Sequence, residues 1–305
     1  MVPPLQYEGN SSRDEEMILK ADFEADWTAE LRRIMQDDWA MNLAAVEPQE
    51  LAILFFHAGK RRIEPRPRVV KLSTSFACPP GHQEGWAELL AKIEAGDDLS
   101  PHLSLRIEDV MGKDPLLLDW GVYHLHLGQA LHPKKKGFFE RTGPVVFGFP
   151  TADAFHAIGI YQHGAWSDSS VIEIMHSNWP HLTQRAQMQG CGMSLARNYT
   201  DEDRSKLRAA GINLITPLSD GTFLFPVGGG YSANGIWVNG VIASDREREL
   251  IKGIQSQVIA QTELIDQALT AEGYDGSSEV ITRLNFNNGT MWVSFEGFKA
   301  IMPVE

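Results

Sequence analysis

Residues 119–128 read Asp-Trp-Gly-Val-Tyr-His-Leu-His-Leu-Gly, and two kinds of side chain alternate along most of this run. Successive side chains of a β-strand point to opposite faces, so the run is typical of a strand with two different sides. The core face would carry Tyr123, Leu125 and Leu127. His124 and His126 would share the other face with Val122, about 6–7 Å apart along the strand. Two histidines so placed can act as an acid/base pair, bind a metal ion, or form an ordinary polar surface.

Two further apolar runs, residues 144–149 and 154–163, predict strands that follow the first one through short connections. Consecutive strands with short links favour an antiparallel meander. A mostly helical region precedes them. After them, a capping box at Ser244 predicts one long helix over residues 245–272, and Asn287-Asn288-Gly289 predicts a β-hairpin. The residues from Gly235 to Ile242 predict another strand.

The sequence therefore predicts an α+β protein in three segments. Residues 1–100 would form a mostly helical N-terminal region, and residues 101–199 a small antiparallel-sheet domain of catalytic type. Residues 200–305 would form a C-terminal α+β domain with one long helix and a regulatory or interaction role.

The net charge of −13 argues at first against nucleic-acid binding, but the charge is unevenly distributed. Residues 1–100 carry −7 and residues 201–305 carry −6, whereas residues 101–200 are neutral and hold eight of the ten histidines. The run from Lys60 to Lys71 has six bases and one acid. It is interpreted either as an anion-binding arm or as an exposed loop paired with the acidic N-terminal helix. The central third is the best candidate region for a site.

The sequence predicts a cytoplasmic protein. No stretch approaches 18 consecutive apolar residues, and the N-terminus lacks the pattern of a signal peptide. The two cysteines, Cys78 and Cys191, have no metal-type spacing and are expected to be free thiols in a reducing compartment.

Four side chains near the predicted sheet suit cleavage of a phosphodiester. His124 and His126 lie on the first strand, His163 ends the third, and Arg141 precedes the second. This chemistry needs a base, an acid and a cation, and in RNA the 2′-hydroxyl can be the nucleophile, so neither a metal nor a protein nucleophile is required. One histidine would deprotonate the hydroxyl, another would protonate the leaving oxygen, and Arg141 would hold the phosphate through two parallel donors. The candidate substrate-binding residues are Trp120, Tyr123, Lys134, Lys135, Lys136 and Trp166.

The same residues carry a resemblance to known proteins. Residues 119–128, Arg141 to Phe147, the corner His163-Gly164-Ala165-Trp166 and Asn178-Trp179-Pro180 are similar to a pattern in uncharacterised bacterial proteins. The order of elements resembles that of the barnase–EndoU–colicin–RelE ribonuclease superfamily, in which compact α+β enzymes cleave RNA without a metal. Over about residues 100–180, the resemblance implies an endoribonuclease of toxin or phage-defence type that forms a 2′,3′-cyclic phosphate.

Two other functions remain open. In a metal-dependent hydrolase, His124 and His126 would bind zinc or manganese, with His163 and a carboxylate such as Asp119 completing the set. In a non-enzymatic binding or regulatory protein, the aromatic residues near the strand would be anchors. RNA is the expected partner. An inhibitory protein, the chain's own C-terminal domain and a second copy are further candidates, and no membrane is expected.

Overall fold

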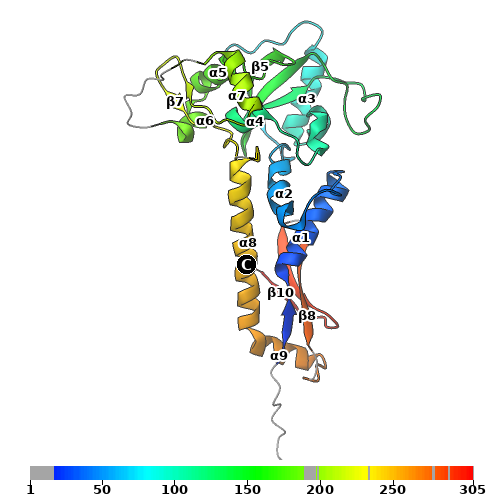
Figure 1. Cartoon of the computed structure of the whole chain (residues 1–305). Helices are drawn as coiled ribbons and strands as arrows, with labels where there is room; N and C mark the ends of the chain where they lie inside the picture. The colour runs from blue at the N-terminus through cyan, green and yellow to red at the C-terminus, as the bar shows by residue number, and fades with distance from the viewer. Residues whose placement is uncertain are drawn as a thin grey trace, which may run out of the picture. The chain divides into compact units, whose positions relative to one another are not determined.

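The computed structural model describes residues 17–188, 197, 199–232, 234–276, 279–287 and 289–304. Contacts divide the chain into a central unit, residues 35–244, and a terminal unit, residues 1–34 with 245–305. Both helices and strands in open sheets are present, which confirms the predicted α+β class (Figure 1). The boundaries predicted after residues 100 and 199 do not coincide with this division, because the two ends of the chain pair with each other.

The central unit is built on a four-stranded sheet in the order β2-β5-β4-β3. The predicted meander is present: β4 (Pro144–Pro150) pairs antiparallel with both β3 (Tyr123–His126) and β5 (Ala154–Gln162). A fourth strand, β2 (Val69–Leu72), pairs parallel with β5 and comes from the basic run.

Helices cover both faces of this sheet. On one face, α3 (Gln83–Ala95) packs against Tyr123, Leu125 and Leu127 of the β3 segment. On the other face, α5 (Ser170–Asn178) packs against side chains that include Val122. The expected core face of the first strand is therefore correct, but the opposite face is also largely covered.

The remaining short elements of the central unit surround this core. They are η2 (Pro48–Glu50), α2 (Leu51–Gly59), η3 (Ser100–His102), η4 (Leu105–Glu108), α6 (Pro180–Thr183), η5 (Gln184–Ala186), α7 (Asp201–Ala209), β6 (Thr216–Pro217) and β7 (Phe223–Leu224).

The first part of the quoted run is helical, contrary to the predicted strand. Helix α4 spans Pro115–Trp120 and ends at Gly121, whose φ of 75° reverses the chain into β3. Gly228 closes this end of the helix, since its N–H donates to the Asp119 carbonyl at 2.9 Å. A Cβ at position 228 would lie 2.1 Å from the Leu117 carbonyl oxygen, so only glycine fits.

Asp119 is buried in an ionic cluster with two arginines of α7. Its carboxylate lies 2.8 Å from Arg208 and 3.5 Å from Arg204, and all three side chains are at most 4% exposed. The Arg208 guanidinium also lies 4.0 Å from the Trp120 ring centroid and donates to the Trp166 carbonyl. The cluster thus joins α4 and α7 to the segment that follows β5.

Replacing Asp119 with alanine is expected to lower the free energy of unfolding by about 3–5 kcal/mol, because two buried guanidinium groups lose their counter-charge. Glu202→Ala, which breaks an exposed pair with Lys206 on the same helix, is the control and should cost less than about 0.5 kcal/mol. Urea unfolding followed by tryptophan fluorescence measures both. Equal stabilities of the two variants would contradict the assigned role.

The terminal unit contains a second four-stranded sheet in the order β1-β8-β9-β10. Strand β1 (Leu19–Ala21) lies parallel to β8 (Val280–Asn287), which forms the predicted hairpin with β9 (Thr290–Phe295). Strand β10 (Ile301–Pro303) forms the far edge. Helix α1 (Phe23–Arg33) follows β1, and its Asp26 accepts a hydrogen bond from the Leu284 N–H, which continues the pairing of β8 beyond β1.

The predicted long helix is present with different bounds. Helix α8 spans Val238–Ala260, includes part of the segment predicted as a strand, and contains the division between the units. Helix α9 (Thr262–Ala271) follows after Gln261. The π-helical turn η1 (Ile34–Asp38) contains the other division.

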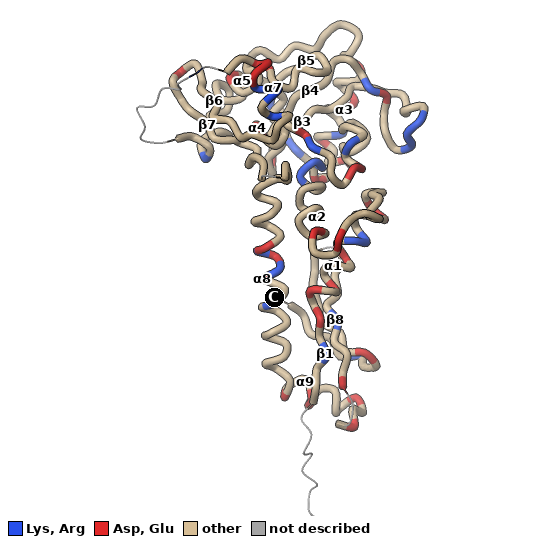
Figure 2. Tube along the Cα trace, in the orientation of Figure 1, with Lys and Arg blue, Asp and Glu red and all other residues tan. Residues whose placement is uncertain are grey.

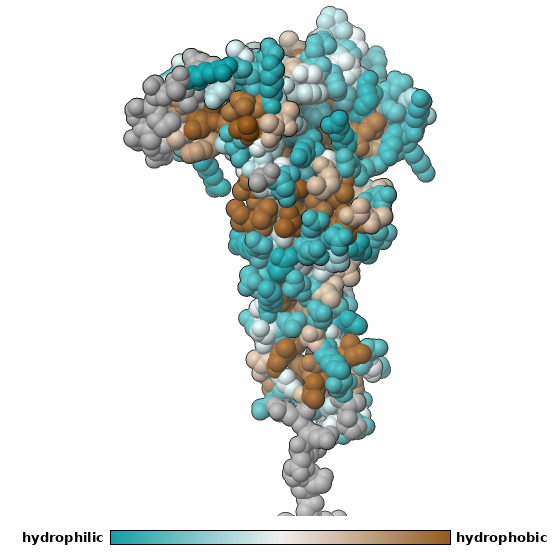
Figure 3. Space-filling view, viewed as in Figure 1, coloured by the Kyte–Doolittle hydropathy of each residue, from teal (hydrophilic) through white to brown (hydrophobic). Residues whose placement is uncertain are grey.

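Apolar side chains are exposed where α9 approaches β10 in the terminal unit (Figure 3). Leu264 and Ile301 are 63% and 64% exposed and border a cavity of about 190 Å³. No helix in the described ranges is long and apolar enough to cross a membrane. Cys78 is a free thiol, and Cys191 lies outside the described residues.

Candidate active site

A cavity of about 320 Å³ in the central unit brings together two of the predicted histidines. It is lined by His124, His163, Trp166, Tyr123, Asp114, Pro115, Lys113, Arg61, Leu103, Ser104, Arg106 and Ile107. These residues come from the β3 strand, the chain after β5 and the segment that leads into α4. Three lysine or arginine side chains and one carboxylate line the cavity, so a negatively charged ligand suits it.

His124 is oriented by a carboxylate that the sequence did not single out. One oxygen of Asp114 caps α4 by accepting the Leu117 N–H at 3.1 Å, and the other lies 3.3 Å from Nδ1 of His124. Burial by itself raises the pKa of Asp114, but His124, the Leu117 N–H and Arg61 outweigh it and hold this pKa below its ordinary value. The carboxylate places a negative charge beside Nδ1 and leaves Nε2 for a ligand.

His163 lies beside the same aromatic ring as His124. The Trp166 ring centroid is 4.5 Å from that of His124 and 4.9 Å from that of His163, and Phe147 stacks on Trp166 at 5.6 Å. Partial burial and the nearby His124 and Arg141 lower the pKa of the otherwise exposed His163. Its imidazole is therefore neutral near pH 7, as a general base requires.

His126 lies behind this pair and does not line the cavity. Its side chain is 2% exposed, its Nδ1 accepts the Thr142 N–H at 3.1 Å, and its ring is 5.6 Å from that of His163. Burial and the cationic Arg141 lower the pKa of His126 to about 3. A histidine that stays neutral and buried is suited to packing against His163 rather than to donating a proton to a substrate.

The Arg141 guanidinium is occupied by the backbone. Its three nitrogens donate to the carbonyls of Phe139, at 3.1 Å, of Pro101, at 3.1 Å, and of Leu103. The planar fork that would grip a phosphate instead joins the segment after α3 to the loop before β4. The predicted phosphate contact of Arg141 would require these hydrogen bonds to break.

Arg141→Lys is expected to lower the free energy of unfolding by about 1–3 kcal/mol, because an ammonium cannot reach three divergent carbonyls. Arg66→Lys at an exposed position is the matched control and should stay within about 0.5 kcal/mol of wild type. Urea unfolding measures both. A fully stable Arg141→Lys protein that has lost cleavage would instead support the predicted phosphate contact.

The other predicted binding residues are dispersed. Trp120 is 1% exposed and packs against Arg208, so no nucleobase can stack on it. Tyr123 lines the cavity, and its hydroxyl donates to the Lys60 carbonyl at 2.6 Å. Lys134, Lys135 and Lys136 do not line this cavity; Lys135 forms an ion pair with Glu108.

Arg106 and Lys113 supply exposed cations at the cavity, and the sequence did not identify them. They lie in one segment with Asp114, and two buried side chains hydrogen-bond to the backbone of that segment. Arg61 donates to the Arg106 and Asp109 carbonyls at 2.6 and 2.7 Å. His57, fully buried, donates from Nε2 to the Gly112 carbonyl at 3.0 Å.

The basic run at residues 60–71 is thus not simply an exposed loop, because three of its arginines donate to backbone carbonyls. Arg61 and Arg68 are 4% and 7% exposed, and their guanidinium groups donate to backbone carbonyls. Arg62 donates to the Trp39 and Ile107 carbonyls. The buried arginines of the run hold neighbouring loops together.

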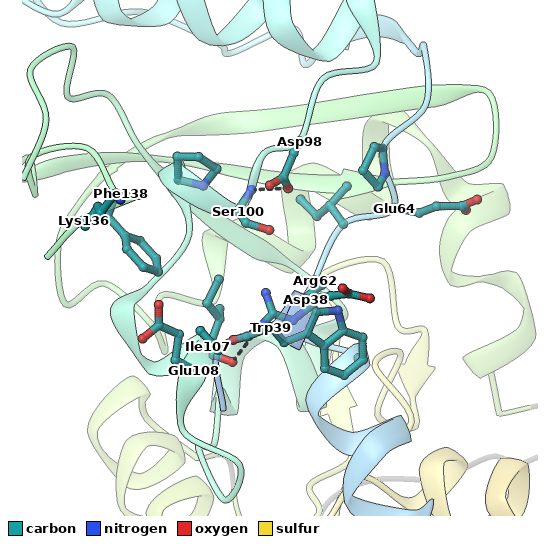
Figure 4. Close-up of a pocket in the computed structure, with 16 residues that line it drawn as sticks. Asp38, Trp39, Arg62, Glu64, Asp98, Ser100, Ile107, Glu108, Lys136 and Phe138 are labelled. Carbon is teal, nitrogen blue, oxygen red and sulfur yellow. Dashed lines mark hydrogen bonds between the residues drawn. The ribbon is translucent and has the colours of Figure 1, made fainter. Parts of the chain in front are cut away.

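A larger cavity, about 540 Å³, lies next to the first, and Ile107 lines both. Figure 4 shows carboxylates around it, with Arg62 beside the Trp39 ring at 4.8 Å. Four carboxylates and two cations line this cavity: Asp38, Glu64, Asp98, Glu108, Arg62 and Lys136. It holds none of the histidines and is charged oppositely to the first.

In comparisons with known proteins, no family model, curated protein or solved structure matches this chain. The function must therefore be inferred from the geometry of the site. In the part of the chain that the structure describes, no group of three or more His, Cys, Asp or Glu side chains is arranged to hold a metal ion. The zinc or manganese site at His124 and His126 stays a prediction.

Proposed function

We propose that this chain is a ribonuclease that uses His163 and His124 as a general base and a general acid. The proposal depends on one observation above all: both imidazoles line one cavity and contact one Trp166 ring, and the partly buried Asp114 carboxylate lies 3.3 Å from Nδ1 of His124. This pair replaces the pair of His124 and His126 expected from the strand.

The reaction needs no group that the substrate and these residues lack. Neutral His163 takes the proton of a ribose 2′-hydroxyl, whose oxygen attacks the adjacent phosphorus. His124, which lies beside the Asp114 carboxylate, gives a proton to the departing 5′-oxygen. The products are a 2′,3′-cyclic phosphate and a 5′-hydroxyl. Arg106 and Lys113 are the cations available for the charge that develops on the phosphoryl oxygens.

Cleavage of a mixed-sequence RNA in excess EDTA tests the proposal, with the ends of the products identified. Cyclic phosphate ends formed by the wild type and absent with His163→Ala would support it. Activity that appears only on adding zinc or manganese would support the metal-dependent alternative. Folded protein without activity in either condition would support a binding function.

A further inference from the structure

The charges around the cavity set the length of the ligand. On the basis of the proposed function, we infer that the substrate is a short phosphodiester of dinucleotide size, and that polymeric RNA is disfavoured by the cavity's surroundings. Every charged side chain that carries the inference belongs to the central unit.

The cavity offers few cations to a nucleic-acid backbone. Of its three lysine and arginine side chains, Arg61 is committed to backbone carbonyls, which leaves Arg106 and Lys113. Two cations match the one or two phosphates of a short ligand. A volume of about 320 Å³ is near the lower limit of small-molecule sites, about 300 Å³.

The charges of the neighbouring cavity disfavour the binding of a longer RNA. It shares Ile107 with the first cavity, and its four carboxylates against two cations would repel a phosphate backbone that continued in that direction. One of its carboxylates, Glu108, also neutralises Lys135.

The rest of the central unit does not supply the positive charge that the cavity lacks. It carries 18 basic and 22 acidic residues, a net charge of −4. In Figure 2, acidic and basic residues are interspersed along this unit in the ranges described. A protein that binds long nucleic acid neutralises many phosphates with a basic surface, and this unit has an acidic balance instead.

The test compares a mixture of dinucleoside monophosphates with an unstructured RNA of about 30 nucleotides, at about 50 and 200 mM salt. Because the surroundings of the cavity disfavour the polymer, the expected kcat/KM per scissile bond is about threefold lower on the RNA than on the dinucleoside monophosphates. For the longer RNA, the expected slope of log kcat/KM against log salt is about −1.4, since two phosphate contacts to a single strand contribute about −0.7 each. A polymer advantage above about tenfold, or a slope steeper than about −3, would overturn the inference.

Glu108→Gln removes one negative charge from the acidic cavity and frees Lys135 from its ion pair, and Glu94→Gln, at an exposed position of α3 outside both cavities, is the control for the loss of charge alone. Removing the negative charge at Glu108 should raise kcat/KM on the polymer about threefold and leave the dinucleotide rate unchanged. The same gain with Glu94→Gln, or no gain with Glu108→Gln, would contradict the assigned role of this cavity.

Binding separates a failure of this inference from a failure of the proposed function. If neither substrate is cleaved, the proposed function fails, and the length preference is then decided by titrating a 3′-mononucleotide and the RNA against tryptophan fluorescence. Similar affinities for the two ligands would support a short ligand. Preferential binding of the RNA, or binding of neither, would overturn the inference.

Discussion

His124→Ala and His163→Ala are each expected to lower kcat for RNA cleavage by about 10²–10⁴, the usual contribution of a positioned acid or base. His132→Ala is the control: His132 accepts two loop N–H groups and does not line the cavity, so full activity is expected. Circular dichroism shows whether each variant is folded. A folded His163→Ala protein with wild-type kcat would remove His163 from the mechanism.

Asp114→Asn separates positioning from chemistry, because an amide keeps the size and the helix cap but loses the negative charge beside His124. The variant should keep KM and lose kcat, and the alkaline limb of its pH profile should move to lower pH, since the general acid His124 loses the negative charge beside its imidazolium. An unchanged pH profile would show that Asp114 only caps α4.

Acidification from pH 6.5 to about 4.5 is expected to destabilise the central unit strongly, because three buried histidines must stay neutral in the folded chain. Burial lowers the pKa of His57 and His102 to about 4 and that of His126 to about 3. In the unfolded chain each binds a proton near pH 6.5. The stability is therefore complete above pH 6.5 and is lost as the pH falls towards 4, by about 1.4 kcal/mol per pH unit for each histidine.

The hydrogen bonds of these histidines also predict that acid lowers the stability of the folded chain. One ring nitrogen of each histidine faces a donor: His57 faces the Trp237 N–H at 3.2 Å, and His102 faces the Lys92 ammonium at 3.1 Å. A proton added at either nitrogen would meet another proton. Urea unfolding at several pH values measures the slope, and His102→Phe should reduce it by about one proton. A stability independent of pH from 6.5 to 4.5 would contradict the assignment.

Alternation along residues 122–127 predicted the core face of β3, because a strand buried against one helix must keep its apolar side chains in phase. It could not predict that α5 covers much of the second face, since a helix some 50 residues away supplies that cover. The helix at 115–120 was not predicted, since it has only six residues and its capping residue, Asp114, was not identified from the sequence.

The cavity was only partly predictable from the sequence. His124, His163, Tyr123 and Trp166 were identified, because the strands that carry them are adjacent in the chain. Asp114, Arg106 and Lys113 were not, since a short irregular segment has no periodicity. The backbone contacts of Arg141 and of the arginines of the basic run were not predicted for another reason: a sequence shows the charge of an arginine but not the carbonyls that accept its hydrogen bonds.

The parallel pairing of β1 with β8 sets an order for folding during synthesis. A ribosome releases the residues of β1 first, but their partner strand emerges about 260 residues later. At about 5–20 residues per second, the N-terminal segment waits at least about 13 s without its partner, while residues 35–244 can already fold. A chain stopped between Ser244 and β8 therefore holds the complete candidate active site but lacks the sheet that joins its two ends.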